Sequence, residues 1–329
     1  MAGIAPEVLV LCQESAFGTP VLTAGNVDYT LTSTFVVPTP QSNGFQADFK
    51  PNLQEIPFGG GFDVCVDVVA STYETKATFS TYGYPALTAF LLNAACVQVN
   101  SGGSSPWSTT EPQYDLASIA AFHAVRMRSG TVKRRKLVGG KISRLNLSCS
   151  RQDPRLKITG EIIFQKEVGN AADSSSDVSS TVFPLPADTN YPTGPYLFTH
   201  TASSVIYTAS AITSYESIAV NVANKLDVRH FESAYPSVIA YLGRETTVQM
   251  DLLLKSSPNL RADYQAITSR AFSVTWNNGT KSSQISLGNS NHITDLPYDL
   301  PLGQQFMQKL SLKNRYNLSA GTDLAITNT

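Results

Sequence analysis

The sequence contains two copies of one pattern, and this duplication restricts the folds open to the chain. AFHAVRMRSGT at residues 121–131 and AFSVTWNNGT at 271–280 both alternate apolar and polar residues before ending in Gly-Thr. Upstream, ETKATFSTY begins at Glu74 and ETTVQMDLLL begins at Glu245, and each leads into a proline and a helical pattern. Three matched elements in the same order indicate a tandem duplication of one structural unit.

The first copy carries an insertion between its helix and its next strand. The offset between copies is 171 at the glutamates (245 − 74) but 150 at Phe122 and Phe272 (272 − 122). The extra residues lie within 97–120, a stretch rich in Gly, Ser and Pro that predicts a long loop.

Most of the remaining chain alternates with a period of two, which predicts β-strands. In KISRLNLSCS, for example, Leu145, Leu147 and Cys149 face one side while the intervening polar residues face the other. We therefore expect a mainly β protein with two tandem units, residues 1–166 and 196–329. Each unit is predicted to be a β-sandwich or open barrel with one α-helix.

Residues 167–195 separate the two predicted units. This stretch combines Gly, Ser and Asp with four prolines. It is too poor in apolar residues to be expected to pack firmly, so we interpret it as a linker or an extended arm.

Composition argues against several classes of protein. The net charge is -1 and only 15% of residues are charged, against about 25% in typical proteins. A duplex-binding domain normally has a clear basic excess, so this chain is not expected to grip nucleic acid, although DNA could still pass close by. The apolar run near the N-terminus contains Glu7 and lacks a basic region before it, and no stretch is long enough to span a membrane. We expect no membrane association.

Motifs for catalysis, nucleotides and metals are missing from the sequence. There is no G-x-S-x-G, no G-x-x-x-x-G-K-[ST] and no G-x-G-x-x-G, and the four cysteines and four histidines are widely spaced. Asp63 and Asp67 are four apart on a predicted strand, about 13 Å, which is too far for an acid–base pair. We predict no enzyme activity, no metal and no cofactor, and cysteines that are mostly reduced and buried.

The one run of basic residues comprises Lys133, Arg134, Arg135 and Lys136. It could be a solvated hairpin tip, or it could contact an acidic patch on a neighbouring copy or DNA phosphates. The run has no interleaved aromatic residues, so it favours DNA binding only weakly.

Three segments together resemble a known family. They are QESAFGTPV near the N-terminus, GGKISRLNLSCSRQDPRLKITGEIIF at 139–164, and NKLDVRHFESAYPSVIAYLGRETTVQMDLLL at 224–254. Their order and their patterns of strands, glycines and charges are similar to those of the tail tube (major tail) proteins of long-tailed bacteriophages. The resemblance extends over nearly the whole chain.

The resemblance implies a structural virion protein made in the host cytoplasm and located in the phage tail. Single-unit relatives form hexameric rings, so a two-unit chain would form a trimeric ring with pseudo-sixfold symmetry. Four strands from each unit would close a barrel across chains, which removes exposed sheet edges, and head-to-tail stacking of rings would build a tube. The implied partners are other copies of the chain, tape measure, tail terminator and tail tip proteins, and phage DNA passing through without sequence recognition.

Two sets of residues acquire roles from this resemblance. Alternation places a polar set toward the lumen: Asp63, Asp67, Arg144, Asn146, Ser148, Lys157, Thr159, Glu161, Asn221, Thr247, Gln249 and Asp251. The segment 38–61 is predicted to be a loop that either folds onto its own unit or contacts an adjacent ring, through Phe45, Phe49, Leu53, Ile56 and Phe58. The segments 97–120 and 167–195 are further candidates for contacts between rings.

Two other classes of function compete with this interpretation. A carbohydrate-binding or adhesin-type β-sandwich would present exposed aromatic residues on a flat face, but the chain has only Trp107 and Trp276, and Trp276 lies within an alternating strand. An enzyme on a β scaffold has no supporting motif. A β-sandwich alone decides nothing, because that fold hosts many functions.

Overall fold

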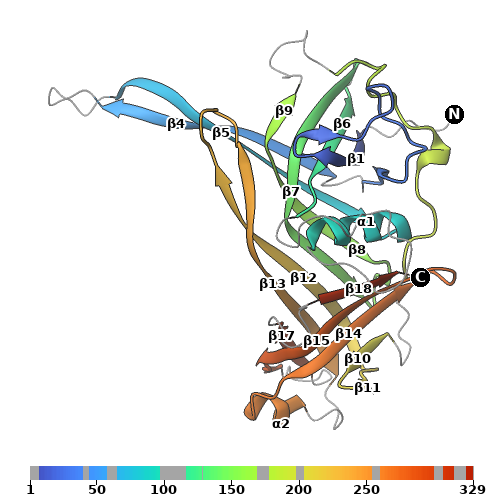
Figure 1. The fold of residues 1–329 in the computed structure, drawn as a ribbon. Helices are drawn as coiled ribbons and strands as arrows, with labels where there is room; N and C mark the ends of the chain where they lie inside the picture. The colour runs from blue at the N-terminus through green and yellow to red at the C-terminus, as the bar shows by residue number, and fades with distance from the viewer. Residues whose placement is uncertain are drawn as a thin grey trace.

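The described residues form mainly antiparallel β-structure with two α-helices, as the alternation predicts (Figure 1). A computed structural model describes residues 7–39, 44–57, 65–96, 116–127, 129–168, 178–197, 204–253, 260–299, 307–314 and 324–328.

The described residues of the first half form nine strands and one helix. They are β1 (Glu7–Ala16), β2 (Thr19–Pro20), β3 (Thr34–Val37), β4 (Phe45–Pro57), β5 (Cys65–Tyr82), α1 (Pro85–Ala95), β6 (Ile119–Arg126), β7 (Val132–Ser150), β8 (Lys157–Phe164) and β9 (Lys166–Val168).

The second half begins after a short 3-10 helix at Asp188–Asn190. Its elements are β10 (Val205–Tyr207), β11 (Ser210–Ala211), β12 (Tyr215–Arg229), β13 (Val238–Leu253), α2 (Leu260–Gln265), β14 (Arg270–Asn277), β15 (Ser282–Asp295), β16 (Tyr298–Asp299), β17 (Met307–Lys313) and β18 (Leu324–Asn328).

The two halves share six strand pairings in the same chain order. The pairs β1–β6, β4–β5, β5–β8, β6–β7, β7–β8 and β7–β9 correspond to β10–β14, β12–β13, β13–β17, β14–β15, β15–β17 and β15–β18. One set of strand neighbours repeated in order supports the duplication read from the sequence.

The alignment of Phe122 with Phe272 is wrong by one residue. Leu11 of β1 pairs with Ala121, whereas Tyr207 of β10 pairs with Phe272, so Ala121 is the counterpart of Phe272. The cause is the hairpin turn that follows each strand: 127–131 in the first half is one residue longer than 278–281 in the second. Phe122 consequently points to the outer side of its sheet, while Phe272 points into the main core.

A single antiparallel sheet runs through both halves in the order β4-β5-β8-β7-β12-β13-β17-β15. Strands β7 and β12 pair from Arg144–Ala223 to Ser150–Ser217 and join the two repeats edge to edge. One face of this sheet is apolar, and the main core lies between it and the smaller sheets formed around β6 and β14.

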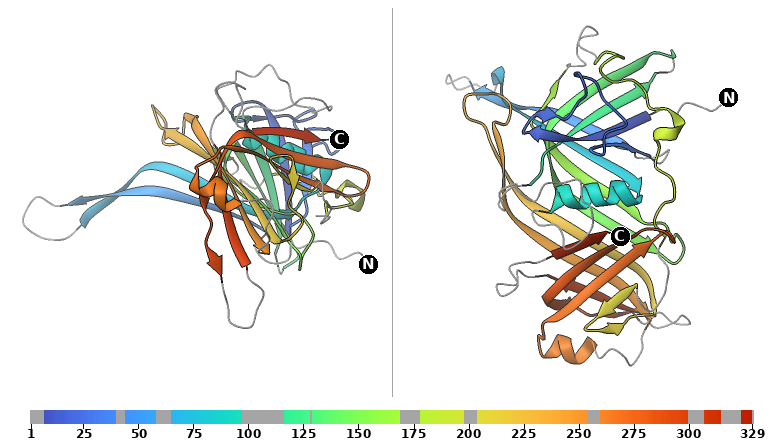
Figure 2. Two further views of the ribbon diagram at one scale, coloured as in Figure 1. Left: turned by 90° about the horizontal axis from the view of Figure 1, so that it is seen from below. Right: turned by 45° about the vertical axis from the view of Figure 1, so that its right-hand side comes forward.

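Helix α1 lies within this core (Figure 2, right). Pro85 occupies its first turn, where no backbone donor is needed. Leu87, Phe90 and Leu91 are almost wholly buried, and the helix is apolar nearly all round, as expected for a helix enclosed by protein. It contacts β7 in the first half and β15 and β18 in the second, so it helps to connect the repeats.

The predicted loop at 38–61 instead contains β4, which pairs with β5 along its whole length. The two strands project from the body as a long arm (Figure 1; Figure 2, left). Pro51 and Pro57 obscure the alternation in the sequence, but an edge strand tolerates proline because one of its sides needs no donors. Phe45 is buried in the main core of its own chain, while the side chains of Phe49, Leu53 and Ile56, and all of Phe58, lie outside the described residues.

Part of the predicted linker packs firmly, contrary to expectation. Residues 178–185, here called the strap, lie across the outer side of the sheet formed by β1, β3 and β6. Phe183 is fully buried, with its ring centroid 5.5 Å from that of Phe122, and Val27 N donates to Val182 O at 2.8 Å. The few apolar residues of the linker are clustered here, so a low average hydrophobicity hid a local anchor.

Candidate functional surface

The polar face of the continuous sheet brings together most of the residues predicted to face a lumen. Registers align Thr159, Asn146, Asn221 and Thr247 as direct neighbours across β8, β7, β12 and β13. All four are partly exposed, and their sequence neighbours point to the core. Four positions that are distant in the chain thus form one row.

The other predicted residues lie in the adjacent rows. Glu161 is opposite Arg144, Lys157 is opposite Ser148, and Gln249 and Asp251 follow on β13. The Ser217 hydroxyl donates to Asp251 Oδ2 at 2.5 Å, which ties β12 to β13. The structure describes the backbone of Asp67 in β5 but not its side chain, and Asp63 lies outside the described residues.

The same face extends onto strands that the sequence interpretation did not use. Lys76 and Thr78 of β5 are exposed beside β8, and Lys309, Ser311 and Lys313 of β17 continue the rows beyond β13. The alternation in MQKLSLK would have identified the β17 positions, because Leu310 and Leu312 are both buried between them.

Charges of both signs alternate over this surface. Lys76 lies 3.0 Å from Glu74, and Lys313 lies 2.8 Å from Glu245, with all four side chains about half exposed. Solvent-exposed pairs of this kind contribute little to stability. Their effect is on the field, because neighbouring opposite charges prevent a large patch of one sign.

A comparison with known protein families identifies the family to which the chain belongs. The sequence matches the family described as phage tail tube protein over residues 8–327. The chain belongs to the phage tail tube protein family. No protein in the curated set matches the sequence. Membership makes the chain a structural component of a bacteriophage tail.

The basic run of this tail tube family member lies within a strand, whereas one of the interpretations of the sequence was a solvated hairpin tip. Residues 133–136 form the start of β7 and pair with β6, and alternating strand geometry divides their side chains between the two faces. Arg134 Nε donates to Phe183 O at 3.0 Å and so holds the strap. Lys136 lies over the Phe122 ring at 5.6 Å, and burial lowers its pKa.

Arg135 belongs to a polar chain with His123 and Glu7 on the face of the sheet away from the strap, and of these three residues only His123 is buried. Arg135 Nε donates to His123 Nδ1 at 3.1 Å, so the neutral imidazole keeps its proton on Nε2, 2.8 Å from Glu7 Oε1. His123 is almost fully buried, and this burial lowers its pKa. Glu7 also accepts a hydrogen bond from Phe45 N at 3.1 Å, which places a carboxylate at the start of β4.

Among the described residues of the first half, Glu14 is a buried carboxylate. Gly139 N and Gly18 N donate to it at 2.8 and 2.9 Å. Burial nevertheless raises its pKa, since these bonds and a further one from the Ser118 side chain offset only part of the desolvation. These bonds attach the turn after β1 to β7, which is a structural role.

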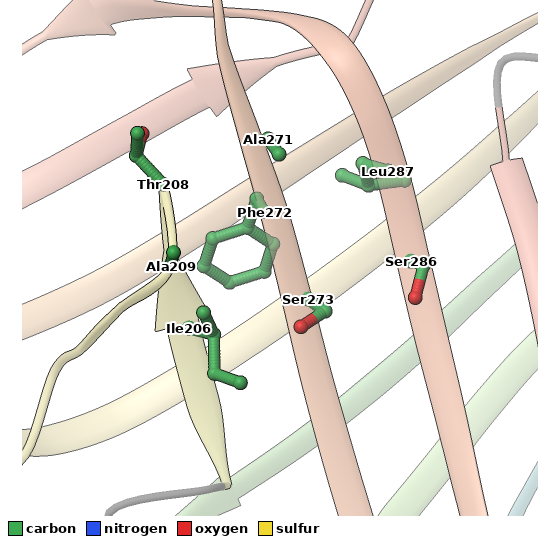
Figure 3. Close-up of a pocket in the computed structure, with 8 residues that line it drawn as sticks. All are labelled: Ile206, Thr208, Ala209, Ala271, Phe272, Ser273, Ser286 and Leu287. Atoms are coloured by element: carbon green, nitrogen blue, oxygen red, sulfur yellow. The ribbon is translucent and has the colours of Figure 1, made fainter.

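A shallow hollow lies on the outer side of the second half (Figure 3). It is lined by Ile206, Thr208, Ala209, Ala271, Phe272, Ser273, Ser286 and Leu287. The lining contains no carboxylate, imidazole or thiol, so it offers no acid–base pair and no strong metal ligand.

The described residues contain no group of three or more His, Cys, Asp or Glu side chains placed to hold a metal ion. None of their helices is long and apolar enough to cross a membrane. Cys12, Cys96 and Cys149 are buried free thiols, and burial raises the pKa of Cys12 and of Cys149 to about 12.

Proposed function

We propose that three copies of the chain assemble into a ring with pseudo-sixfold symmetry, and that stacked rings form the tail tube. The supporting observation is the β7–β12 pairing, which already joins two copies of the repeated unit edge to edge within one chain. A closed sheet has no edges, and a head-to-tail interface between rings continues without limit, so the two contacts together produce a tube.

The polar face of the sheet lines the lumen, and phage DNA passes along it without sequence recognition. Each phosphate held by Lys or Arg adds to the affinity through counterion release, so a basic lining would retain DNA. Here Arg144 is opposite Glu161, and Lys313 is paired with Glu245. A lining of mixed sign lets DNA slide.

The remaining assignments follow from this assembly. The β4–β5 arm, with the segments 97–120 and 167–195, contacts adjacent rings, and the tube ends meet tape measure, tail terminator and tail tip proteins. The chain is made in the host cytoplasm, acts in the virion tail and catalyses no reaction. Trp276 is fully buried and so is not available to a carbohydrate-binding face, and Trp107 lies outside the described residues.

Electron microscopy of the purified, concentrated protein tests the assembly. Hollow filaments made of rings with three or six repeats are the expected result. Discrete closed dimers that do not form filaments would contradict it and favour a binding module.

A second experiment tests the lumen. Lysine substitutions at Asn146, Thr159 and Asn221 should leave tubes intact and slow DNA ejection, while lysine substitutions at exposed positions outside this face serve as the control. Normal ejection by particles with the lysine-lined tube would contradict the proposed role of mixed charge.

A further inference from the structure

The sheet that crosses both repeats ends in two edges, one on β4 and the other on β15 and β16. In the described part of the chain, β4 pairs only with β5, and residues 292–299 pair only with β17. In the correspondence between the two repeats, β4 is the counterpart of β12. Strands β15 and β16 together are the counterpart of the second part of β7. The two edges are therefore copies of the two strands that already pair inside the chain.

Shared details fix the correspondence between β7 and β15. Each strand shifts register once against its neighbour, between Ile142 and Arg144 and between Ile293 and Asp295. The hydroxyl inside each shift donates to the opposite strand: Ser143 Oγ to Glu161 O and Thr294 Oγ1 to Ser311 O, both at 3.2 Å. Positions 143 and 294 are thus equivalent, which makes Ser148 the counterpart of Asp299.

The correspondence between β4 and β12 rests on their common neighbour. Thr75 of β5 and Thr246 of β13 are both 1% exposed, and they pair with Phe49 and Val222. Positions 49 and 222 are thus equivalent, and Gln46 is the counterpart of Ala219.

We propose that β15 and β16 of one chain pair with β4 of the next chain in the register that β7 and β12 use within the chain. Leu147 pairs with Val220 and Ser148 with Ala219 inside the chain. The same register places Tyr298 opposite Ala47 and Asp299 opposite Gln46 of the neighbour. This inference rests on the proposed ring and specifies its interface residue by residue.

The backbone at the β15–β16 edge is oriented for this pairing. Lys309 N donates to Pro297 O at 3.1 Å, so Pro297 faces β17. The N–H and C=O of one strand residue point to the same side, so the donor that proline lacks is on the inner side and not on the free edge. Leu296 and Tyr298 then present complete backbone groups outward, as Leu145 and Leu147 do toward β12.

The residue types at this interface fit the proposed register. They do not fit a register shifted by one residue. Of the side chains that the structure describes here, Ala47 and Leu296 lie on the apolar face, and Gln46, Asp48 and Pro297 are exposed on the polar face. A slip by one residue would exchange the two faces. A slip by two residues in one direction would place Asp295 opposite Asp48, whereas the proposed register places Asp295 opposite Lys50, and opposite charges stabilise such a pair.

Cysteine pairs test the register. Ser148–Ala219 and Gln46–Asp299 are both pairs without mutual backbone hydrogen bonds, for which Cα atoms lie about 4.5 Å apart, within reach of a disulfide. We expect the Gln46→Cys/Asp299→Cys chain to be linked head to tail on oxidation, with the covalent trimer as the largest species on a non-reducing gel. The matched control, Ser148→Cys/Ala219→Cys, should form the disulfide inside a monomer, and the unsubstituted chain measures crosslinking by the native cysteines.

A second control reports a slipped register. Asp48→Cys/Asp299→Cys places the thiols diagonally, about 7–8 Å apart, and should remain monomeric. If micrographs show tubes but only the Asp48/Asp299 pair forms crosslinks, or the Gln46/Asp299 pair forms none, the proposed register is wrong. The proposal that the chain forms a tube would still hold. Covalent trimers without tubes would support the register and contradict stacking. Absence of both trimers and tubes would overturn the ring and the register together.

Discussion

The two repeats share six strand pairings, but the outer surface of the first is covered and that of the second is open. In the first repeat Val10 and Phe122 point outward and are buried by the strap, while their counterparts Ile206 and Ser273 line an open hollow in the second. The inner sides are both apolar and share one core. Duplication thus preserved the pairing and the inner core, while the outer side diverged according to whether a segment covers it.

The largest expected difference between the repeats comes from replacing Phe122 and its counterpart Ser273 by alanine. Phe122→Ala should lower the free energy of unfolding by about 3–5 kcal/mol, because it empties a fully buried site beneath the strap. Ser273→Ala should change it by less than about 0.5 kcal/mol. Urea unfolding of both variants measures the contrast, and equal losses would show that the strap covers no separate core.

The next effect concerns the junction between repeats. Asn224 Nδ2 donates to Ala95 O and to Ile142 O, both at 2.9 Å, and so links β12 to the end of α1 and to β7. Asn224→Ala should cost about 2 kcal/mol of stability, since two buried carbonyls lose a donor. The counterpart of Asn224 on β4 is Pro51, which has no side-chain donor, so the proposed contact between chains would lack this bond. A stability of Asn224→Ala equal to that of the parent chain would show that water replaces the donor.

A smaller loss is expected from the strap's own hydrogen bond. Arg134→Ala removes the donor to Phe183 O and should cost about 1 kcal/mol. Hydrogen exchange should accelerate in residues 178–185 and remain unchanged around the hollow of the second repeat. The counterpart substitution, Gln284→Ala, should leave the strap unaffected, and an equal effect from both would contradict a local role for Arg134.

The smallest effect is a pH dependence confined to the first repeat. Burial lowers the pKa of His123, so the unfolded chain binds this proton more readily than the folded chain. The stabilisation is complete above the unfolded pKa of about 6.5 and is lost as the pH falls from there toward the folded value. Replacing His123 by valine, the residue at its counterpart Val274, should remove this component. Urea midpoints of both chains between pH 8 and pH 5.5 measure it, and parallel curves would contradict the assignment.

Alternation predicted the strands and the polar rows well, because it depends only on which side of a sheet is wet. It placed Asn146, Thr159, Asn221 and Thr247 on polar faces, and registers then made them neighbours. It did not predict that β7 pairs with β12, since alternation does not specify a partner strand. The prolines of β4 concealed a strand that only its edge position permits.

The strap was missed for a different reason. VLVLC in β1 is apolar on both sides, which is typical of a strand covered on both faces, whereas its counterpart SVIYT is apolar mainly on one. That contrast in the sequence signals a cover over the first repeat without showing which segment provides it. The covering residues lie beyond β9, where average composition suggested an unpacked linker.

The strap also changes the stoichiometry available to other proteins. A ring of three chains would present six similar repeats on its inner wall but only three straps on its outer wall. A molecule that contacts the inner wall would meet six nearly equivalent positions. A protein that binds the straps from outside would be limited to three copies per ring. The number of equivalent positions on the exterior of such a tube would therefore equal the number of chains, while the number on the interior would equal the number of repeats.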